Sequence, residues 1–207
     1  MSGLGAYHPR PCMHKMFLLA SVILCVCVLV VPGTSVSCKI DSSNPCKCSF
    51  TDGEGATWNI DISSYFQYPT SPKSDDAAKY TYTYTCYNAP CPRTPISSAV
   101  ACQYIKSQAT DYPLGKVDQD TTWEVTDPSD SSLTFVITYK NGQKSGQRNR
   151  ETKVTFKYGT GNMEMKVTKE DATDTDVIYE MEASGNQVKK FGPSGRKGRS
   201  GGKKDIS

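Results

Sequence analysis

The chain has 207 residues but only two histidines, and both of them, His8 and His14, lie at its N-terminal end. Histidine is the commonest general base and the usual partner of a catalytic serine or cysteine, so its absence from the rest of the chain disfavours most catalytic designs. The sequence also lacks a glycine-rich phosphate-binding loop after a predicted strand. We therefore predict a binding protein, not an enzyme, and no cofactor. A glycosidase that uses two carboxylates is the remaining enzymatic alternative.

No apolar run long enough to span a membrane occurs after Val31. The run before it covers residues 16–31 and follows a short basic segment without acidic residues, which is the pattern of a secretory signal peptide. The small residues Ser35 and Ser37 occupy the −3 and −1 positions of a cut before Cys38. We predict a signal peptide that ends at Ser37, with an uncleaved signal anchor as the alternative. The rest of the chain then enters the secretory lumen, without a further membrane span.

Cysteine is missing after Cys102, so the second half of the chain has none. Six cysteines follow the predicted signal peptide, and because six is an even number and the compartment is oxidising, we predict three disulfides. Sequence alone does not choose among the possible pairings. A zinc site at Cys46 and Cys48 is disfavoured, because one intervening residue is tighter than the usual ligand spacing and no histidine is at hand. The six are Cys38, Cys46, Cys48, Cys86, Cys91 and Cys102.

Charge is unevenly distributed between the predicted domain and the C-terminal tail. Residues 38–188 carry 15 basic and 20 acidic side chains, a net charge of −5, whereas residues 189–207 carry seven basic side chains and one acid. The tail is rich in glycine and serine and nearly free of apolar side chains, so we predict that it is disordered and solvated. Contact with an acidic polymer or lipid is the alternative. We predict no nucleic-acid partner, because the charges lack interleaved stacking aromatics.

Alternation of apolar and polar residues predicts β-strands throughout residues 38–188. The clearest strand covers residues 80–86, where tyrosines alternate with threonines. Asn141-Gly142 and residues 159–162 supply turn chemistry, and no segment shows a sustained helical period. We predict an all-β domain, a single flattened β-barrel or sandwich of short antiparallel strands, stapled by disulfides in its N-terminal half. The other predicted strands cover residues 58–62, 133–139, 154–158, 163–167 and 177–181.

Two polar residues occupy unusual positions in this pattern. Gln103 directly follows Cys102, and a side chain next to a disulfide has a fixed backbone, which suits a group that must be held still to bind a ligand. Arg150 falls on the apolar face of the strand that contains Val154 and Phe156, where a guanidinium needs a partner. On periodicity alone, a structural arginine paired with a carboxylate is the favoured interpretation.

A set of motifs between about Cys46 and Ser184 resembles the mannose 6-phosphate receptor homology domain, a lectin module of the secretory pathway. The most specific motifs are ACQ at residues 101–103 and the R-x-x-x-V-x-F strand within GQRNRETKVTF at residues 146–156. The others are TWNIDISSY, the tyrosine strand that ends in Cys86, the Leu114-Gly115 pair and IYEMEAS at residues 178–184. The resemblance implies a β-rich lectin that binds mannose-type glycans.

In that family a glutamine, an arginine, a glutamate and a tyrosine hold the mannose ring. An amide, a guanidinium, a carboxylate and a phenol can jointly satisfy adjacent sugar hydroxyls, which both donate and accept hydrogen bonds. Asp174 is the alternative for the glutamate, and Arg148 is a less favoured register for the arginine. The resemblance places the four residues at Gln103, Arg150, Glu170 and Tyr179.

The family resemblance also implies a disulfide pattern of Cys48 with Cys86, Cys91 with Cys102 and Cys38 with Cys46. Family members usually carry further cysteines in the second half of the domain, but this chain has Tyr158 and Val177 at those positions. The chain also lacks an Asn-x-Ser/Thr sequon, so it should carry no N-glycan of its own.

The favoured function is a Golgi, endolysosomal or secreted lectin that binds mannose-type glycans, with or without a 6-phosphate, in the sorting or quality control of glycoproteins. The alternative is a module with a degenerate sugar site that serves as a protein-interaction or accessory subunit. Retention of all four residue types favours the lectin, and loss of the second-half cysteines favours the accessory module.

Overall fold

The computed structural model describes residues 36–52, 55–93, 98–127, 133–186 and 188. The predicted basic tail lies outside these residues, as does the predicted signal peptide apart from Val36 and Ser37. These two residues form strand β1 (Val36–Ser37), which pairs with Val125 and Glu124, so a cut before Cys38 would remove a strand of the fold. Among the described residues, no helix is long and apolar enough to cross a membrane, and no cluster of metal-binding side chains occurs.

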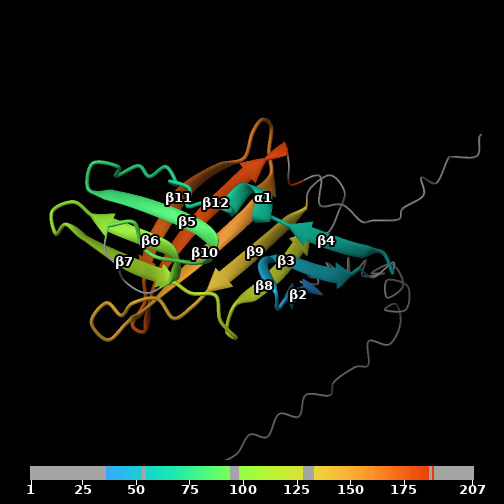
Figure 1. Cartoon of the computed structure of the whole chain (residues 1–207), viewed down its shortest axis with the longest axis horizontal. Helices are drawn as coiled ribbons and strands as arrows, with labels where there is room; N and C mark the ends of the chain where they lie inside the picture. Colours follow the sequence, from blue (N-terminus) through green and yellow to red (C-terminus); the bar gives the residue numbers. More distant parts are fainter. Residues whose placement is uncertain (1–35, 53–54, 94–97, 128–132, 187, 189–207) are drawn as a thin grey trace, which may run out of the picture. The chain divides into compact units, whose positions relative to one another are not determined.

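The described part of the chain is built almost entirely of strands, which confirms the all-β prediction (Figure 1). The other strands are β2 (Lys39–Asp41), β3 (Asn44–Thr51), β4 (Thr57–Asp61), β5 (Tyr80–Ala89), β6 (Ala99–Ile105), β7 (Thr110–Gly115), β8 (Thr122–Asp127), β9 (Thr134–Tyr139), β10 (Asn149–Tyr158), β11 (Glu164–Ala172) and β12 (Asp176–Gly185). One short helix, α1 (Ser63–Phe66), lies between β4 and β5.

The strands form three sheets that are not closed into a barrel. Strands β2-β3-β4 and β5-β6-β7 make two three-stranded sheets, and the third sheet has the order β1-β8-β9-β10-β12-β11. All neighbours are antiparallel except β10 and β12, which run parallel over their full length. The prediction of purely antiparallel strands is therefore wrong for this pair. Strand β11 lies outside β12 in the sheet, so the chain places β12 beside β10 only after an intervening strand.

Aromatic side chains connect the sheets through a buried core. Phe156 of β10 stacks on Phe135 at 4.6 Å between ring centroids and meets Phe66 of α1 edge-on at 5.7 Å. The hydroxyls of Tyr84 and Tyr139 are 3.0 Å apart in the buried interior, so one of them donates a hydrogen bond to the other. The alternation that predicted these strands follows real burial at most positions, although Tyr80, Met163 and Val167 are half-buried and Tyr158, at the end of β10, is 42% exposed.

Three disulfides staple the N-terminal half, as predicted, but only Cys91–Cys102 has the pairing that the family resemblance implied. The other two bonds are Cys38–Cys48 and Cys46–Cys86, so the predicted partners of Cys46 and Cys48 are exchanged. The reason is the strand register: Cys48 lies opposite Ile40, two residues from Cys38, which leaves Cys46 to reach β5.

Candidate functional site

The four polar residues assigned by the family resemblance come from four strands in two different sheets. Gln103 lies on β6, whereas Arg150, Glu170 and Tyr179 lie on β10, β11 and β12. In the six-stranded sheet, Glu170 of β11 lies directly opposite Tyr179 of β12. On the other side of β12, Tyr179 lies beside Thr152 of β10, and Arg150 is two residues before Thr152 on the same face of β10. Three of the four side chains therefore come together through strand pairing alone, and contact between the sheets adds Gln103.

The Gln103 side chain is the centre of the hydrogen-bond network and is only 2% exposed. Its Nε2 donates to the hydroxyl of Tyr82 at 2.9 Å and to Oε2 of Glu170 at 3.2 Å. Its Oε1 accepts from the hydroxyl of Tyr179 at 3.4 Å. Both amide hydrogens thus have partners, which fixes the orientation of the amide.

Arg150 is held by neutral groups and not by a carboxylate. Its side chain is buried, and Nη1 donates to the backbone carbonyls of Gln143 at 2.9 Å and Lys144 at 3.0 Å. Its Nε donates to the hydroxyl of Tyr179 at 3.4 Å, and its guanidinium carbon lies 4.7 Å from the centroid of the Tyr112 ring. Arg150 forms no ion pair with any described residue, so the structural ion pair favoured on periodicity is wrong. No described carboxylate therefore neutralises the guanidinium through a direct ion pair.

Close backbone packing brings the two carbonyls to Arg150. A Cβ atom on Gly142 would lie 2.5 Å from the carbonyl carbon of Leu114 and 2.8 Å from Cβ of Arg150, so only glycine fits there without a shift. The amide of Gly142 donates to the Arg150 carbonyl at 3.0 Å, and the amide of Gln143 donates to the carbonyl of Pro113 at 2.8 Å. The connection between β9 and β10 is thereby fixed against β7.

Burial shifts the pKa values of the phenols in the network upward. It raises the pKa of Tyr82 to about 12, with the hydrogen bond from Gln103 acting in the opposite direction. Burial also raises the pKa of Tyr179, and the neighbouring Arg150 offsets part of that rise. Both hydroxyls therefore remain hydrogen-bond donors at neutral pH.

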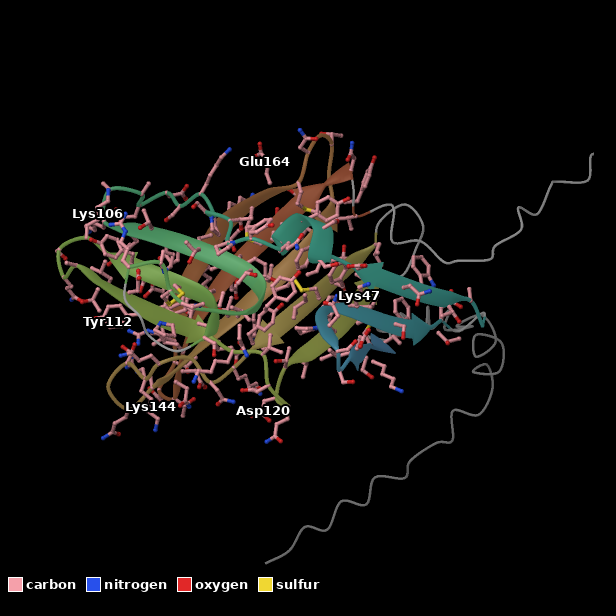
Figure 2. All side chains as sticks on the ribbon, viewed as in Figure 1. Lys47, Lys106, Tyr112, Asp120, Lys144 and Glu164 are labelled. Carbon is pink, nitrogen blue, oxygen red and sulfur yellow. A yellow bond between two sulfur atoms is a disulfide. The ribbon has the colours of Figure 1, made fainter. Side chains whose placement is uncertain are left out.

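The network lines an open pocket of about 510 Å³, a volume within the usual range for small-molecule sites. Lys144 and Arg148 line it together with Arg150, and Glu170 is the one acid among its described lining residues. Tyr112 and Lys144, which belong to β7 and to the β9–β10 connection, are labelled in Figure 2. The pocket thus combines paired polar groups with a net positive charge.

The alternative positions from sequence do not join this network. Asp174 lies in the turn between β11 and β12 and does not line the pocket. Arg148 lines the pocket, but its side chain is exposed, and its backbone bonds with Ser145. The residues that the structure joins in one network are the first choices from the resemblance: Gln103, Arg150, Glu170 and Tyr179.

Two aromatic residues of the site were missed in the sequence. Tyr82 lies directly opposite Gln103 in the β5–β6 ladder, and Tyr112 lies opposite Gln103 on its other side, in β7. Tyr82 carries a sequence signal, because it occupies the buried face of the clearest predicted strand. Tyr112 carries none, because the segment around it, TDYPLG, contains a proline and shows no clear alternation.

No protein-family model and no curated protein matches the sequence. Among solved structures, the chain is similar to domain 11 of the echidna mannose 6-phosphate/IGF2R receptor, determined by NMR. The sequence identity is 15% and the TM-score is 0.42, and the match covers 67% of this chain and 91% of the receptor domain.

Proposed function

We propose that this protein is a lectin of the secretory pathway that binds mannose-type glycans on glycoproteins, for their sorting or quality control. It acts in the Golgi or endolysosomal lumen or outside the cell. The observation that carries the proposal is the network that joins Gln103, Arg150, Glu170 and Tyr179 in one pocket. Four polar residue types selected for sugar binding from sequence motifs converge there from two sheets.

The chemistry of the network suits vicinal hydroxyls. Each sugar hydroxyl can donate one hydrogen bond and accept others, and the pocket offers a cation, an anion, an amide and a phenol within one cluster. The hydrogen bonds among these groups already fix their directions, so little side-chain ordering remains to oppose binding. The pocket therefore favours the ligand whose hydroxyls have the matching axial or equatorial placement.

Binding without catalysis is the role that this pocket supports. A glycosidase of the usual kind needs two carboxylates that flank the scissile bond. Glu170 is the single carboxylate among the described lining residues, and Gln103 donates to it. The acid needed to protonate a leaving group has no counterpart among those lining residues.

A phosphate on the sugar fits the charge of the pocket. Lys144 and Arg148 line it beside Arg150, so three cations oppose one carboxylate. Arginine and lysine are the residues that bind phosphate oxygens in proteins. We propose mannose 6-phosphate as the preferred form of the ligand, with Lys144 and Arg148 as its phosphate contacts.

Strand pairing supports the lectin over the accessory-module alternative. It relied on the absence of cysteines near Glu170 and Tyr179, which would leave these residues in poorly constrained segments. In the structure Glu170 and Tyr179 are direct partners in the β11–β12 ladder, and β12 pairs with β10 on its other side. Strand pairing thus constrains the two residues without a disulfide.

A glycan array probed with the secreted, fully oxidised protein tests the proposal. We expect binding to high-mannose or phosphomannosyl structures, with Arg150→Ala lowering it by about tenfold or more, because hydrogen bonds to charged groups contribute ~1.5–3 kcal/mol. Arg93→Ala is the matched control, since Arg93 stacks on Tyr104 and does not line the pocket. An array without signal from a folded protein would refute the lectin. Signal confined to unphosphorylated glycans would refute only the phosphate preference.

A further inference from the structure

We propose that the pocket contains a second sugar subsite, built by Gln108 and Tyr112, so that the ligand is an oligosaccharide and not a single ring. The inference rests on the proposed lectin function and extends it. Both residues line the same pocket as the four-residue network. Neither belongs to that network through its own hydrogen bonds, so they are available for the next ring of a glycan.

The amide of Gln108 is oriented by a neighbouring phenol. The Tyr112 hydroxyl donates to Oε1 of Gln108 at 2.6 Å, a short hydrogen bond that fixes the oxygen end of the amide. Nε2 of Gln108 has no hydrogen-bond partner among the described residues. Two amide hydrogens are therefore presented at the pocket with their direction already set, as a sugar hydroxyl or ring oxygen would require.

The backbone around Gln108 is also fixed. Its amide donates to the carbonyl of Ile105 at 3.1 Å, and its carbonyl accepts from Oγ1 of Thr110 at 3.0 Å. Ala109 follows with a φ of 50°, the left-handed conformation of a tight turn. The backbone of Gln108 is thus held at the tip of the β6–β7 turn, and its exposed side chain is held by the Tyr112 hydroxyl.

Tyr112 links this pair to the four-residue network. One part of its ring lies against the guanidinium of Arg150, and the residue as a whole is only half-buried. The exposed part of the ring offers an apolar surface next to a polar tip, which suits the C–H face of a sugar ring. A glycan whose first ring contacts Arg150 would therefore place a linked ring against Tyr112 and within reach of Gln108.

The chemistry of this pair favours a neutral sugar over a phosphate. Gln108 and Tyr112 carry no charge at neutral pH, whereas Lys144 and Arg148 belong to a different segment, the β9–β10 connection. A phosphate would be drawn to those cations. The pocket thus offers separate groups for an anionic substituent and for a second, uncharged ring.

The test compares methyl α-mannoside with α1,2-, α1,3- and α1,6-linked mannobiose by titration calorimetry or NMR. We expect the wild-type protein to bind at least one mannobiose about two- to tenfold more tightly than the monosaccharide, the range given by one neutral hydrogen bond. Gln108→Ala and Tyr112→Phe should each lower this preference, because the first removes the amide donor and the second removes the hydroxyl that orients it. Tyr112→Phe keeps the ring over Arg150, so it removes only the hydroxyl that orients Gln108. Gln67→Ala and Tyr68→Phe, at exposed positions outside the pocket, are the matched controls.

The outcomes separate the two proposals. If the protein binds methyl α-mannoside but no mannobiose more tightly, the subsite is refuted and the lectin stands. If neither these sugars nor mannose 6-phosphate binds to the folded protein, the lectin itself is refuted. If Gln108→Ala and Tyr112→Phe weaken both ligands equally, the pair has a structural role in the β6–β7 turn, and the subsite is again refuted.

Discussion

The two sheets that contribute to the pocket are stabilised in different ways. The β5-β6-β7 sheet has three strands, and two disulfides tie it down: Cys46–Cys86 to β3 and Cys91–Cys102 to the loop after β5. The six-stranded sheet has no disulfide within strands β8–β12, but its central strand β10 is paired on both sides. Small sheets bury too little surface to be stable alone, and covalent links compensate for this. The proposed sugar pocket joins one sheet of each kind.

This comparison also bears on the second half of the chain, which has no cysteine. Tyr179 lies on β12, which is paired on both sides, whereas Glu170 lies on the edge strand β11, which pairs with β12 alone and has an irregular register between Val167 and Lys169. Covalent links are needed where a segment is short or leaves the sheet. Packing and ladder hydrogen bonds are sufficient where a long strand is flanked by two others.

The largest effect on the free energy of unfolding should come from a change in the core of the six-stranded sheet. Phe156 is fully buried, stacks on Phe135 and contacts Phe66 edge-on, so Phe156→Ala should lower the free energy of unfolding by about 3–5 kcal/mol. Urea unfolding measures the change. Thr155→Ala, on the opposite face of the same strand, is the control and should change it by less than about 1 kcal/mol. A loss below about 1 kcal/mol for Phe156→Ala would show that packing does not hold this sheet.

Removal of a disulfide should have the next largest effect, and it should depend on loop length. The Cys46–Cys86 bond spans 40 residues and the Cys91–Cys102 bond spans 11. Replacing both cysteines of the longer bond by serine should cost about 2–4 kcal/mol, and the shorter bond should contribute about 1 kcal/mol less, because a longer loop gains more entropy on unfolding. The reverse order in calorimetry would contradict this account. Peptide mapping of the native protein would check the Cys38–Cys48 pairing.

The smallest effect on the free energy of unfolding should come from the ion pairs on the six-stranded sheet. Hydrogen bonding with Lys157 lowers the pKa of Glu182 against the opposing effect of burial, and Lys166 adds to the lowering. Because the folded-state pKa is depressed, the stabilisation is complete above the unfolded value of 4.5 and is lost as the pH falls through the folded-state pKa. These lysines are largely exposed, so Glu182→Gln should cost less than about 1 kcal/mol at pH 7. A cost that stays the same well below the folded-state pKa would contradict the electrostatic origin.

Strand positions could be predicted from the sequence, because alternation is a local pattern, whereas the four polar residues of the pocket were named only by the family resemblance and their role stays a prediction. Period-two alternation located β5, β9, β10 and β12, and short motifs located Gln103 and Arg150. The disulfide pairing could not be predicted, because Cys46 and Cys48 lie on the same face of β3 and only the register against β2 decides which one reaches Cys38. The parallel pairing of β10 with β12 and the contact of Tyr112 with Arg150 are likewise long-range features without a local signal.

The central claim is that side chains from the disulfide-linked β5-β6-β7 sheet and from the six-stranded sheet, whose strands β8–β12 have no disulfide, make one mannose site. NMR titration of the oxidised protein with methyl α-mannoside and its C2 epimer, methyl α-glucoside, tests it most directly, with Gln103→Ala and Arg150→Ala as one variant from each sheet. We predict saturable binding of the mannoside, weaker binding of the glucoside, and loss of mannoside binding by about tenfold or more in either variant. Equal binding of the two sugars, or mannoside binding that survives in a folded Arg150→Ala protein, would contradict the claim.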